Sequence, residues 1–287
     1  MLRSQSGKRS AAALTAIPAD AYRSMQSDRF RVLLCRRLRL PFLTFQHDCE
    51  GCGARLDQHG DHYAACMRAG RVQARAKPVE FTWAQVLREA GATVHVQKLL
   101  RETTLPVDLG DARRIDALAT GLPLYMGRPL FCDATIRSPL HADGTPHEKA
   151  ATDDGAVLAR AQADKERKYH DVHDSPIAEL ITLGVELGGR WNEAAHGLLR
   201  GIAKHKVRNT TLLLRRSAEL AWADRWWSML AVTVQNSFAA SVLAAGGPGI
   251  VLDGSADDEP EMDLLFDAQR WDAAMDDIHF ADRENGP

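Results

Sequence analysis

The segment CEGCGARLDQHGDHYAAC, which begins at Cys49, constrains the fold of this chain more than any other. It holds three of the five cysteines and two of the eleven histidines of the 287-residue sequence. Cys49 and Cys52 have the spacing at which one tight turn presents two thiolates to a zinc ion. If the next segment is helical, His62 and Cys66 lie one turn apart and can face the same ion, with His59 as the alternative nitrogen ligand. This arrangement predicts a closed, structural zinc knuckle rather than a catalytic metal site.

Cysteine usage and charge limit the class of protein. An odd number of cysteines, most of them in one cluster, favours metal binding in a reducing compartment over a disulfide framework. Charged residues interrupt the apolar stretches well before a membrane-spanning length, so no transmembrane helix is expected. The formal net charge of −2 is uneven, because residues 253–287 carry twelve acidic side chains and two arginines. The remaining body is therefore basic, which suits a polyanionic partner, and the acidic tail is predicted to be mobile.

The rest of the chain alternates between helical and strand patterns. A flexible basic leader is expected over residues 1–20, followed by a basic amphipathic helix that ends near residue 43. Apolar periodicity and Pro/Gly punctuation then predict a helix, three strands, a helix, a strand and two C-terminal helices. These elements are expected at residues 78–91, 93–100, 113–120, 128–139, 155–172, 177–187, 190–207 and 211–245. Pro78 and Gly91 mark the start and the end of the first of these helices.

Two aspartates stand within predicted strands that are otherwise apolar. A carboxylate in such a place, as in RRIDALA (Asp116) and LFCDATI (Asp133), is costly to bury unless a cation accompanies it. On adjacent strands the two side chains would form a magnesium site. Lys165 and Lys168 on the following helix can steady phosphate charge or orient water, and Glu80 can add a third acid. The alternative is that each acid forms an ordinary salt bridge with a neighbouring arginine.

The order and the amino-acid sequences of these segments resemble the C-terminal part of site-specific non-LTR retrotransposon proteins, especially the dinoflagellate proteins that carry this module without a full polymerase. In that family a Cys-Cys-His-Cys zinc knuckle precedes a restriction-like endonuclease of the PD-(D/E)XK class. The resemblance extends over about two thirds of the chain, from about residue 49 to residue 245. It is carried by the zinc segment quoted above and by EFTWAQVLREAG, RRIDALATGLPL, FCDATIRSPL, DGAVLARAQADKERKY, VELGGRW and LAWADRWWSMLAVTVQ.

The resemblance implies roles for individual residues. Arg114–Asp116 stands where the family has Arg/Lys-Pro-Asp, with isoleucine in place of the proline. Asp133 stands for the second acid, and Lys165 with Tyr169 stands for the Lys…Tyr pair on the helix that follows. Thr135 occupies the position at which restriction enzymes of this class carry lysine, so the lysine must come from the helix. The chain contains no motif that resembles a polymerase.

These expectations describe an α/β protein with a PD-(D/E)XK restriction-endonuclease-like core of helix, three strands, helix and strand. An N-terminal zinc knuckle precedes the core, and C-terminal helices follow it. The expected division is a basic leader and amphipathic helix at residues 1–44, the zinc knuckle at 45–70, the endonuclease domain with its C-terminal helices at 76–250, and the acidic tail at 251–287.

The expected function is nicking of DNA at a target site with Mg²⁺ or Mn²⁺. Asp116 and Asp133 would hold the catalytic ion, and Lys165, Lys168 and Glu80 would stand beside it. Basic and aromatic residues of the helix and the domain are expected to contact DNA: Arg36, Arg37, Arg39, Arg114 and Tyr169.

Two other functions stay open at this point. One is a nucleic-acid-binding remnant that has kept the fold and lost the chemistry. The other is a zinc-stapled protein-interaction module that docks through the acidic tail. The expected partners are DNA and, by resemblance, element RNA and a reverse transcriptase supplied by another protein, with no membrane. The expected location is the nucleus.

Overall fold

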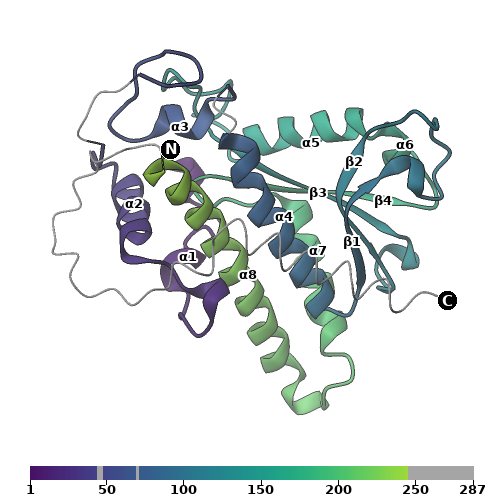
Figure 1. Cartoon of the computed structure of the whole chain (residues 1–287). Helices are drawn as coiled ribbons and strands as arrows, with labels where there is room; N and C mark the ends of the chain where they lie inside the picture. Colours follow the sequence, from purple (N-terminus) through teal and green to yellow (C-terminus); the bar gives the residue numbers. More distant parts are fainter. Residues whose placement is uncertain (44–47, 69–70, 245–287) are drawn as a thin grey trace. The chain divides into compact units, whose positions relative to one another are not determined.

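The fold is a mixed α/β arrangement around a four-stranded sheet (Figure 1). The computed structural model describes residues 1–43, 48–68 and 71–244. The strands are β1 (Thr93–Leu99), β2 (Arg114–Thr120), β3 (Leu130–Arg137) and β4 (Glu179–Glu186). The helices are α1 (Ala12–Thr15), α2 (Ser27–Leu38), α3 (Asp61–Ala65), α4 (Arg71–Glu89), α5 (Ala156–Lys168), α6 (His170–His173), α7 (Glu193–Lys206) and α8 (Leu212–Leu243). Within these residues, no helix combines the length and the apolar character needed to cross a bilayer.

The sheet has the strand order β1-β2-β3-β4. The first three strands form an antiparallel meander, and β4 then pairs in parallel with β3. A parallel pair needs a crossover connection, and α5 with α6 provides it. The predicted order of helix, three strands, helix and strand is therefore confirmed.

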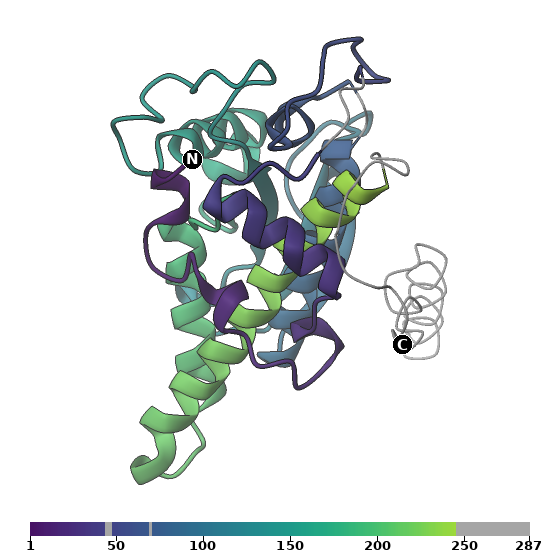
Figure 2. The same ribbon diagram turned by 90° about the vertical axis from the view of Figure 1, so that its left-hand side faces the viewer.

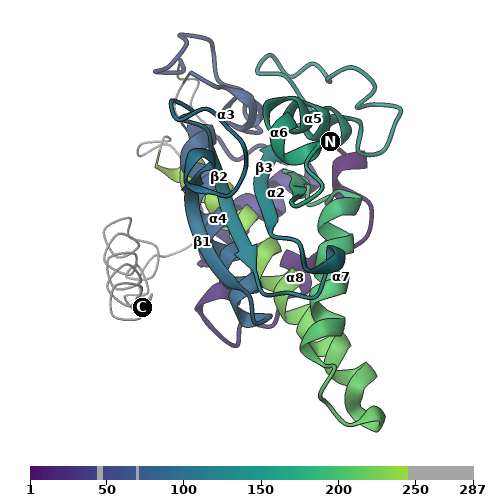
Figure 3. The ribbon, with the colours of Figure 1, turned by 90° about the vertical axis from the view of Figure 1, so that its right-hand side faces the viewer.

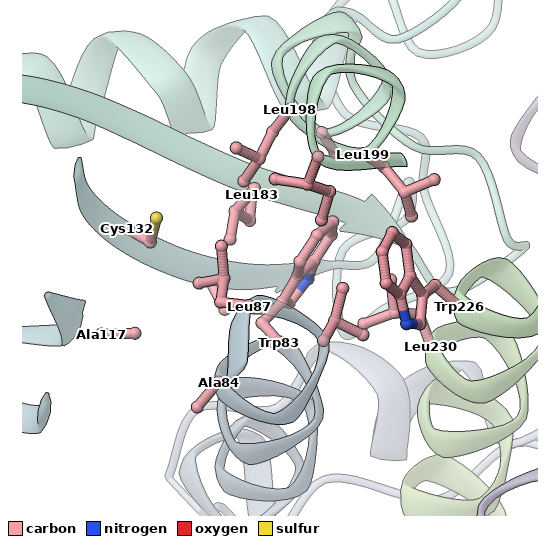
Figure 4. Close-up of a cluster of buried hydrophobic side chains, with 14 of the residues drawn as sticks. Trp83, Ala84, Leu87, Ala117, Cys132, Leu183, Leu198, Leu199, Trp226 and Leu230 are labelled. Atoms are coloured by element: carbon pink, nitrogen blue, oxygen red, sulfur yellow. The ribbon is translucent and has the colours of Figure 1, made fainter. Parts of the chain in front are cut away.

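One face of the sheet packs against α4 and α7, and α8 packs against these two helices in the same core (Figure 4). Trp83 and Leu87 project from α4 toward the strands, and Trp226 projects from α8 into the same core. The ring of Trp83 meets those of Trp191 and Trp227 edge to face, at centroid distances of 5.8 and 6.5 Å. Aromatic side chains of this size dominate the apolar area that a core buries. The prediction that the tryptophans of the last helix are core anchors is confirmed for Trp226 and Trp227.

The opposite face carries a smaller cluster under α6 and the end of α5 (Figure 3). Leu118 on β2 and Phe131 on β3 pack here with Tyr169 and Val172. Side chains alternate between the two faces of a strand. Asp116 and Asp133, each two positions from one of these core residues, therefore lie on this second face.

Helix α4 is longer than predicted, because it begins at Arg71 and places Pro78 in its interior. The prediction that Pro78 starts the helix is therefore wrong. Proline has no N–H to donate and normally weakens a helix interior. Val79 and Trp83, on the following turns, are fully buried against the core. We infer that this packing outweighs the missing hydrogen bond. The predicted stop is correct, since α4 ends at Glu89 and Gly91 follows with a φ of 102°.

The leader is not the flexible segment that the sequence predicted. Ser4 is 1% exposed, and its Oγ accepts a 2.9 Å hydrogen bond from the N–H of Gly188. Gly188 is required at this contact, because a Cβ there would lie 2.3 Å from Ser4 Oγ. Arg190 donates to the carbonyl of Arg3, and Arg37 donates to the carbonyl of Ser10. These hydrogen bonds fix the leader on the turn after β4. Figure 2 shows α1 and α2 crossing α8.

The predicted acidic tail, residues 251–287, lies outside the described residues. So do residues 45–47 and 69–70 of the predicted zinc knuckle.

Candidate functional site

Four side chains of the quoted segment converge on one point. The ligand atoms of Cys49, Cys52, His62 and Cys66 all lie within 4.8 Å of one another. Cys49 Sγ is 3.8 Å from Cys66 Sγ, and Cys52 Sγ is 3.3 Å from His62 Nε2. Ligands about 2.0–2.3 Å from a zinc ion lie at such separations on the edges of a tetrahedron. The Cys/His cluster can therefore hold zinc, and His62 rather than His59 is its nitrogen ligand.

Local backbone geometry presents the first pair of thiols. The N–H of Gly53 donates to the carbonyl of Cys49 at 2.7 Å, and the N–H of Cys49 donates to that of Ala54 at 2.8 Å. Gly53 adopts a φ of 71°, which glycine reaches without steric cost. Burial opposes ionisation of Cys49, but the N–H groups of Gly51 and Cys52 lower the pKa of Cys49 to about 6. This thiol is therefore largely ionised at neutral pH, as a zinc ligand must be.

A short helix presents the second pair of ligands. Helix α3 begins after Gly60, and Asp57 accepts hydrogen bonds from the backbone N–H groups of His59, Asp61 and His62. Asp57 thus satisfies N–H groups that have no partner within the helix. The prediction that His62 and Cys66 share one helical turn is confirmed.

The second nitrogen of His62 connects the cluster to the rest of the protein. His62 Nδ1 lies 2.9 Å from the carbonyl oxygen of Ala142, in the loop between β3 and α5. With Nε2 facing the cysteines, Nδ1 carries the proton and donates to this carbonyl. Such a hydrogen bond fixes the tautomer and the orientation of a metal-binding histidine. The Cys/His cluster therefore fits a structural zinc centre that is tied to the loop ahead of α5.

Asp116 and Asp133 lie next to each other on the second face of the sheet. Ala117 pairs with Cys132 in the antiparallel register of β2 and β3, so Asp116 and Asp133 occupy the adjoining position on each strand. Asp133 is 1% exposed. Asp116 Oδ2 accepts a 2.8 Å hydrogen bond from the N–H of Ala134. The expectation that these carboxylates share one edge of two neighbouring strands is met.

Lys165, in the last turn of α5, forms an ion pair with Asp133. The ammonium contacts Asp133 Oδ1, and apart from this ion pair the buried oxygen has no hydrogen-bond partner among the described residues. The pair therefore contributes charge compensation and leaves a lone pair of Asp133 without a donor. Thr135, at the position where the resemblance would place a lysine, is buried in the same pocket.

Glu80 and Gln97 complete the group. Glu80 lies on α4, and its Oε2 accepts a 2.8 Å hydrogen bond from Gln97 Nε2 on β1. The same nitrogen is 3.5 Å from Asp116 Oδ1. Sequence analysis missed Gln97, because a glutamine in a strand of mixed polarity is typical of a solvent-facing position. We call Glu80, Gln97, Asp116, Asp133 and Lys165 the acidic site.

The carboxylates of the acidic site resist ionisation. Burial, followed by the charges of Asp133 and Glu80, raises the pKa of Asp116 to about 8. Burial and the charge of Asp133 also raise the pKa of Glu80. A cation that binds between such groups replaces a proton and relieves their repulsion. Strongly shifted carboxylates that share an open pocket are a physical indication of a functional site.

The acidic site lies in a pocket of about 690 Å³ with a partly cationic rim. Arg113, Arg114, Arg137 and Lys168 line this pocket together with the carboxylates. Burial, followed by the charge of Lys165, lowers the pKa of Lys168. The volume and the mixed charge of the pocket suit a phosphate-containing ligand together with a cation.

Tyr169 has a structural position at the base of this pocket. It is fully buried, and its hydroxyl donates to the carbonyl of Arg114. The hydroxyl oxygen of Tyr169 accepts a 2.6 Å hydrogen bond from Lys168 Nζ. The prediction that Tyr169 contacts DNA directly is therefore wrong. Arg114 is exposed at the rim, where a phosphate can reach it.

The three arginines predicted to contact DNA, in the last turn of α2 and directly after it, make contacts within the fold. Arg36 is 3% exposed, pairs with Asp61 at 3.4 Å and stacks over Phe238. Arg39 forms two hydrogen bonds with Asp61. Arg37 donates to three backbone carbonyls of the leader and of the turn after β4. The prediction is wrong for Arg36, which is buried, whereas the half-buried Arg37 and Arg39 direct their guanidinium groups to carbonyls and a carboxylate of the fold.

Comparison with known protein families and with curated proteins gives no match to this chain.

Proposed function

We propose that this protein is a magnesium- or manganese-dependent DNA endonuclease with a PD-(D/E)XK-type core and a structural zinc knuckle. The single observation that carries this proposal is the convergence of Asp116, Asp133 and Lys165 in one pocket. Two carboxylates on adjacent strands with one ammonium beside them match the needs of phosphodiester hydrolysis. The order of the strands and helices supports the same assignment.

The acidic site fits a hard divalent cation. Mg²⁺ prefers one or two carboxylates and keeps waters and phosphate oxygens as its other ligands. Asp116 and Asp133 offer carboxylate oxygens at the floor of an open pocket, and apart from its ion pair with Lys165 Asp133 Oδ1 has no hydrogen-bond partner among the described residues. Bound there, the ion would neutralise phosphate charge and make a neighbouring water more acidic.

The residues of the chain then have distinct roles. The ammonium of Lys165 stabilises the negative charge that develops on the phosphate when water attacks phosphorus. Lys168 and Arg114 at the rim hold neighbouring phosphates of the strand. Glu80 lies close enough to the carboxylate pair to orient the attacking water.

DNA would enter over the rim of the pocket rather than along the end of α2, because Arg36, Arg37 and Arg39 there contact carbonyls and a carboxylate of the fold. Cleavage in the nucleus, cooperation with a reverse transcriptase supplied by another protein and binding of element RNA remain parts of this proposal that rest on the resemblance alone.

A plasmid-nicking assay tests the proposal. The intact protein with its zinc should convert supercoiled plasmid to open circles in Mg²⁺ or Mn²⁺, whereas Asp133→Ala should not. Arg216→Ala serves as a matched surface control, because this exposed arginine lies on α8, outside the acidic pocket. If the wild type binds DNA but nicks none with either ion, the protein is a binding remnant of the fold. If it neither binds nor nicks DNA, the nucleic-acid assignment is wrong.

A further inference from the structure

Gln97 interrupts the ladder between β1 and β2 beside the carboxylates. The two strands pair at each position except at Gln97 and Asp116, which face each other. Gln97 has a φ of 51°, in the left-handed region that side chains other than glycine rarely adopt. At this position the amide of Gln97 lies against Glu80 and Asp116 of the acidic site.

The amide nitrogen of Gln97 lies between two carboxylates. It is 2.8 Å from Glu80 Oε2 and 3.5 Å from Asp116 Oδ1. An amide NH₂ group has two hydrogens, so it can direct one toward each carboxylate. The reversed amide would place its carbonyl oxygen against the same two groups, where only a protonated carboxyl could donate to it. Gln97 is thus a neutral donor at the point where Glu80 and Asp116 approach each other.

A cation that bridged Glu80 and Asp116 would need the same position. Divalent cations bind carboxylate oxygens at about 2.0–2.6 Å, and the bridging point lies between the two oxygens that Gln97 Nε2 contacts. Two-metal phosphodiesterases place their ions about 3.5–4 Å apart and share a carboxylate between them. Here Asp116 is the carboxylate that both positions would share, with Asp133 on one side and Glu80 on the other.

We infer that Gln97 is a positioning residue that limits the acidic site to one divalent cation, held by Asp116 and Asp133. Its amide occupies the second position and holds Glu80 beside the first. The inference rests on the proposed function, because it assumes that the acidic site binds a divalent cation. It adds that the stoichiometry of the site is set by one neutral side chain on β1.

Titration with Mn²⁺ of the zinc-loaded protein tests this inference, with free Mn²⁺ measured by electron paramagnetic resonance. Gln97→Glu keeps the length of the side chain and replaces the donor with a ligand. Gln97→Gly removes the amide and tolerates the positive φ, so it separates the role of the amide from loss of fold. His95→Ala, an exposed position on the same strand, is the matched control. Thermal melting verifies that each variant is folded.

The wild type and His95→Ala should bind one Mn²⁺ per chain. Gln97→Glu should bind two, and Gln97→Gly should bind the first ion within about threefold of the wild-type affinity and gain a weaker second ion. A side chain that only supported the fold would leave the stoichiometry at one. A single ion in both variants, or two ions in the wild type, would therefore overturn the inference and leave the proposed function intact. A wild type that binds no Mn²⁺ beyond its zinc would instead remove the proposed function itself.

Discussion

Lys165 on α5 forms an ion pair with Asp133 on β3, so a helix supplies the cation beside this strand carboxylate. Position 135 on the strand is a buried threonine. The crossover that makes β3 and β4 parallel lays α5 along this face of the sheet. The lysine can therefore reach the carboxylate pair from outside the sheet.

Replacement of Lys165 should separate metal binding from catalysis. Lys165→Met keeps most of the apolar length and removes the charge, so cleavage should fall by about 100-fold or more because the charge on the phosphate is no longer stabilised. Mn²⁺ binding should persist or tighten, since Asp133 loses a competing cation. Arg167→Met on the exposed side of the same helix is the control. Unchanged nicking by Lys165→Met would contradict its catalytic role.

The two aspartates should respond differently to loss of charge in magnesium-free buffer at pH 8. Asp116→Asn should raise the free energy of unfolding by about 1 kcal/mol, because it removes a poorly solvated charge that repels its neighbours. Asp133→Asn should lower it by about 1–2 kcal/mol, because Lys165 loses its partner. Urea unfolding of the two variants measures both effects. Equal shifts of the same sign would show that the carboxylates are not distinguished by Lys165.

Without magnesium, the stability of the protein should decrease as the pH rises toward the pKa of Asp116. The folded protein holds the proton of Asp116 up to a pKa of about 8, against 3.8 for the ordinary side chain. A raised pKa in the folded state contributes stability below pH 4 that is lost progressively as pH approaches 8. The melting temperature of the wild type should therefore fall relative to that of Asp116→Asn between pH 5 and 8.5. Added Mg²⁺ should reverse the difference. If the melting temperatures of the two proteins changed with pH in parallel, the raised pKa of Asp116 would be contradicted.

Removal of zinc should loosen a loop outside the Cys/His cluster. His62 Nδ1 holds the carbonyl of Ala142, so loss of the ion through a strong chelator or Cys66→Ser should free this loop. Hydrogen exchange should increase at residues 48–66 and 138–155 while β2 and β3 stay protected. Metal analysis should find one zinc per chain before treatment. Unchanged exchange at 138–155 would show that the cluster does not order the loop.

Arg36 should prove structural rather than DNA-binding. Arg36→Met leaves Asp61 with fewer partners at a buried position, so the protein should lose about 2–4 kcal/mol of stability. DNA affinity of the folded variant should stay within about twofold, whereas Arg114→Ala at the rim of the pocket should weaken it. Fluorescence anisotropy with a labelled duplex at fixed salt compares the two. Weaker binding by Arg36→Met alone would restore α2 as a DNA surface.

The sequence by itself determined the parts of this protein that depend on local spacing. The Cys-x2-Cys turn and the helical spacing of His62 and Cys66 identified the Cys/His cluster, because neighbouring ligands are placed by the backbone over a few residues. Period-two and period-3.6 patterns identified the strands and helices for the same reason. Asp116 and Asp133 were recognisable because a charged residue within an apolar strand needs a partner.

Only the tertiary structure decided where side chains from distant segments meet. The basic pattern of α2 predicted a DNA surface, but Arg36 pairs with Asp61 and Arg37 donates to carbonyls of the leader. Ser4 is buried because Gly188 leaves room for it, a contact that no local pattern in the leader indicates. Gln97 belongs to the acidic site through its hydrogen bond to Glu80 on α4, a contact that no local pattern in β1 indicates. Local propensities act over a few residues, whereas long-range packing brings distant groups into contact and decides which polar groups find partners inside the fold.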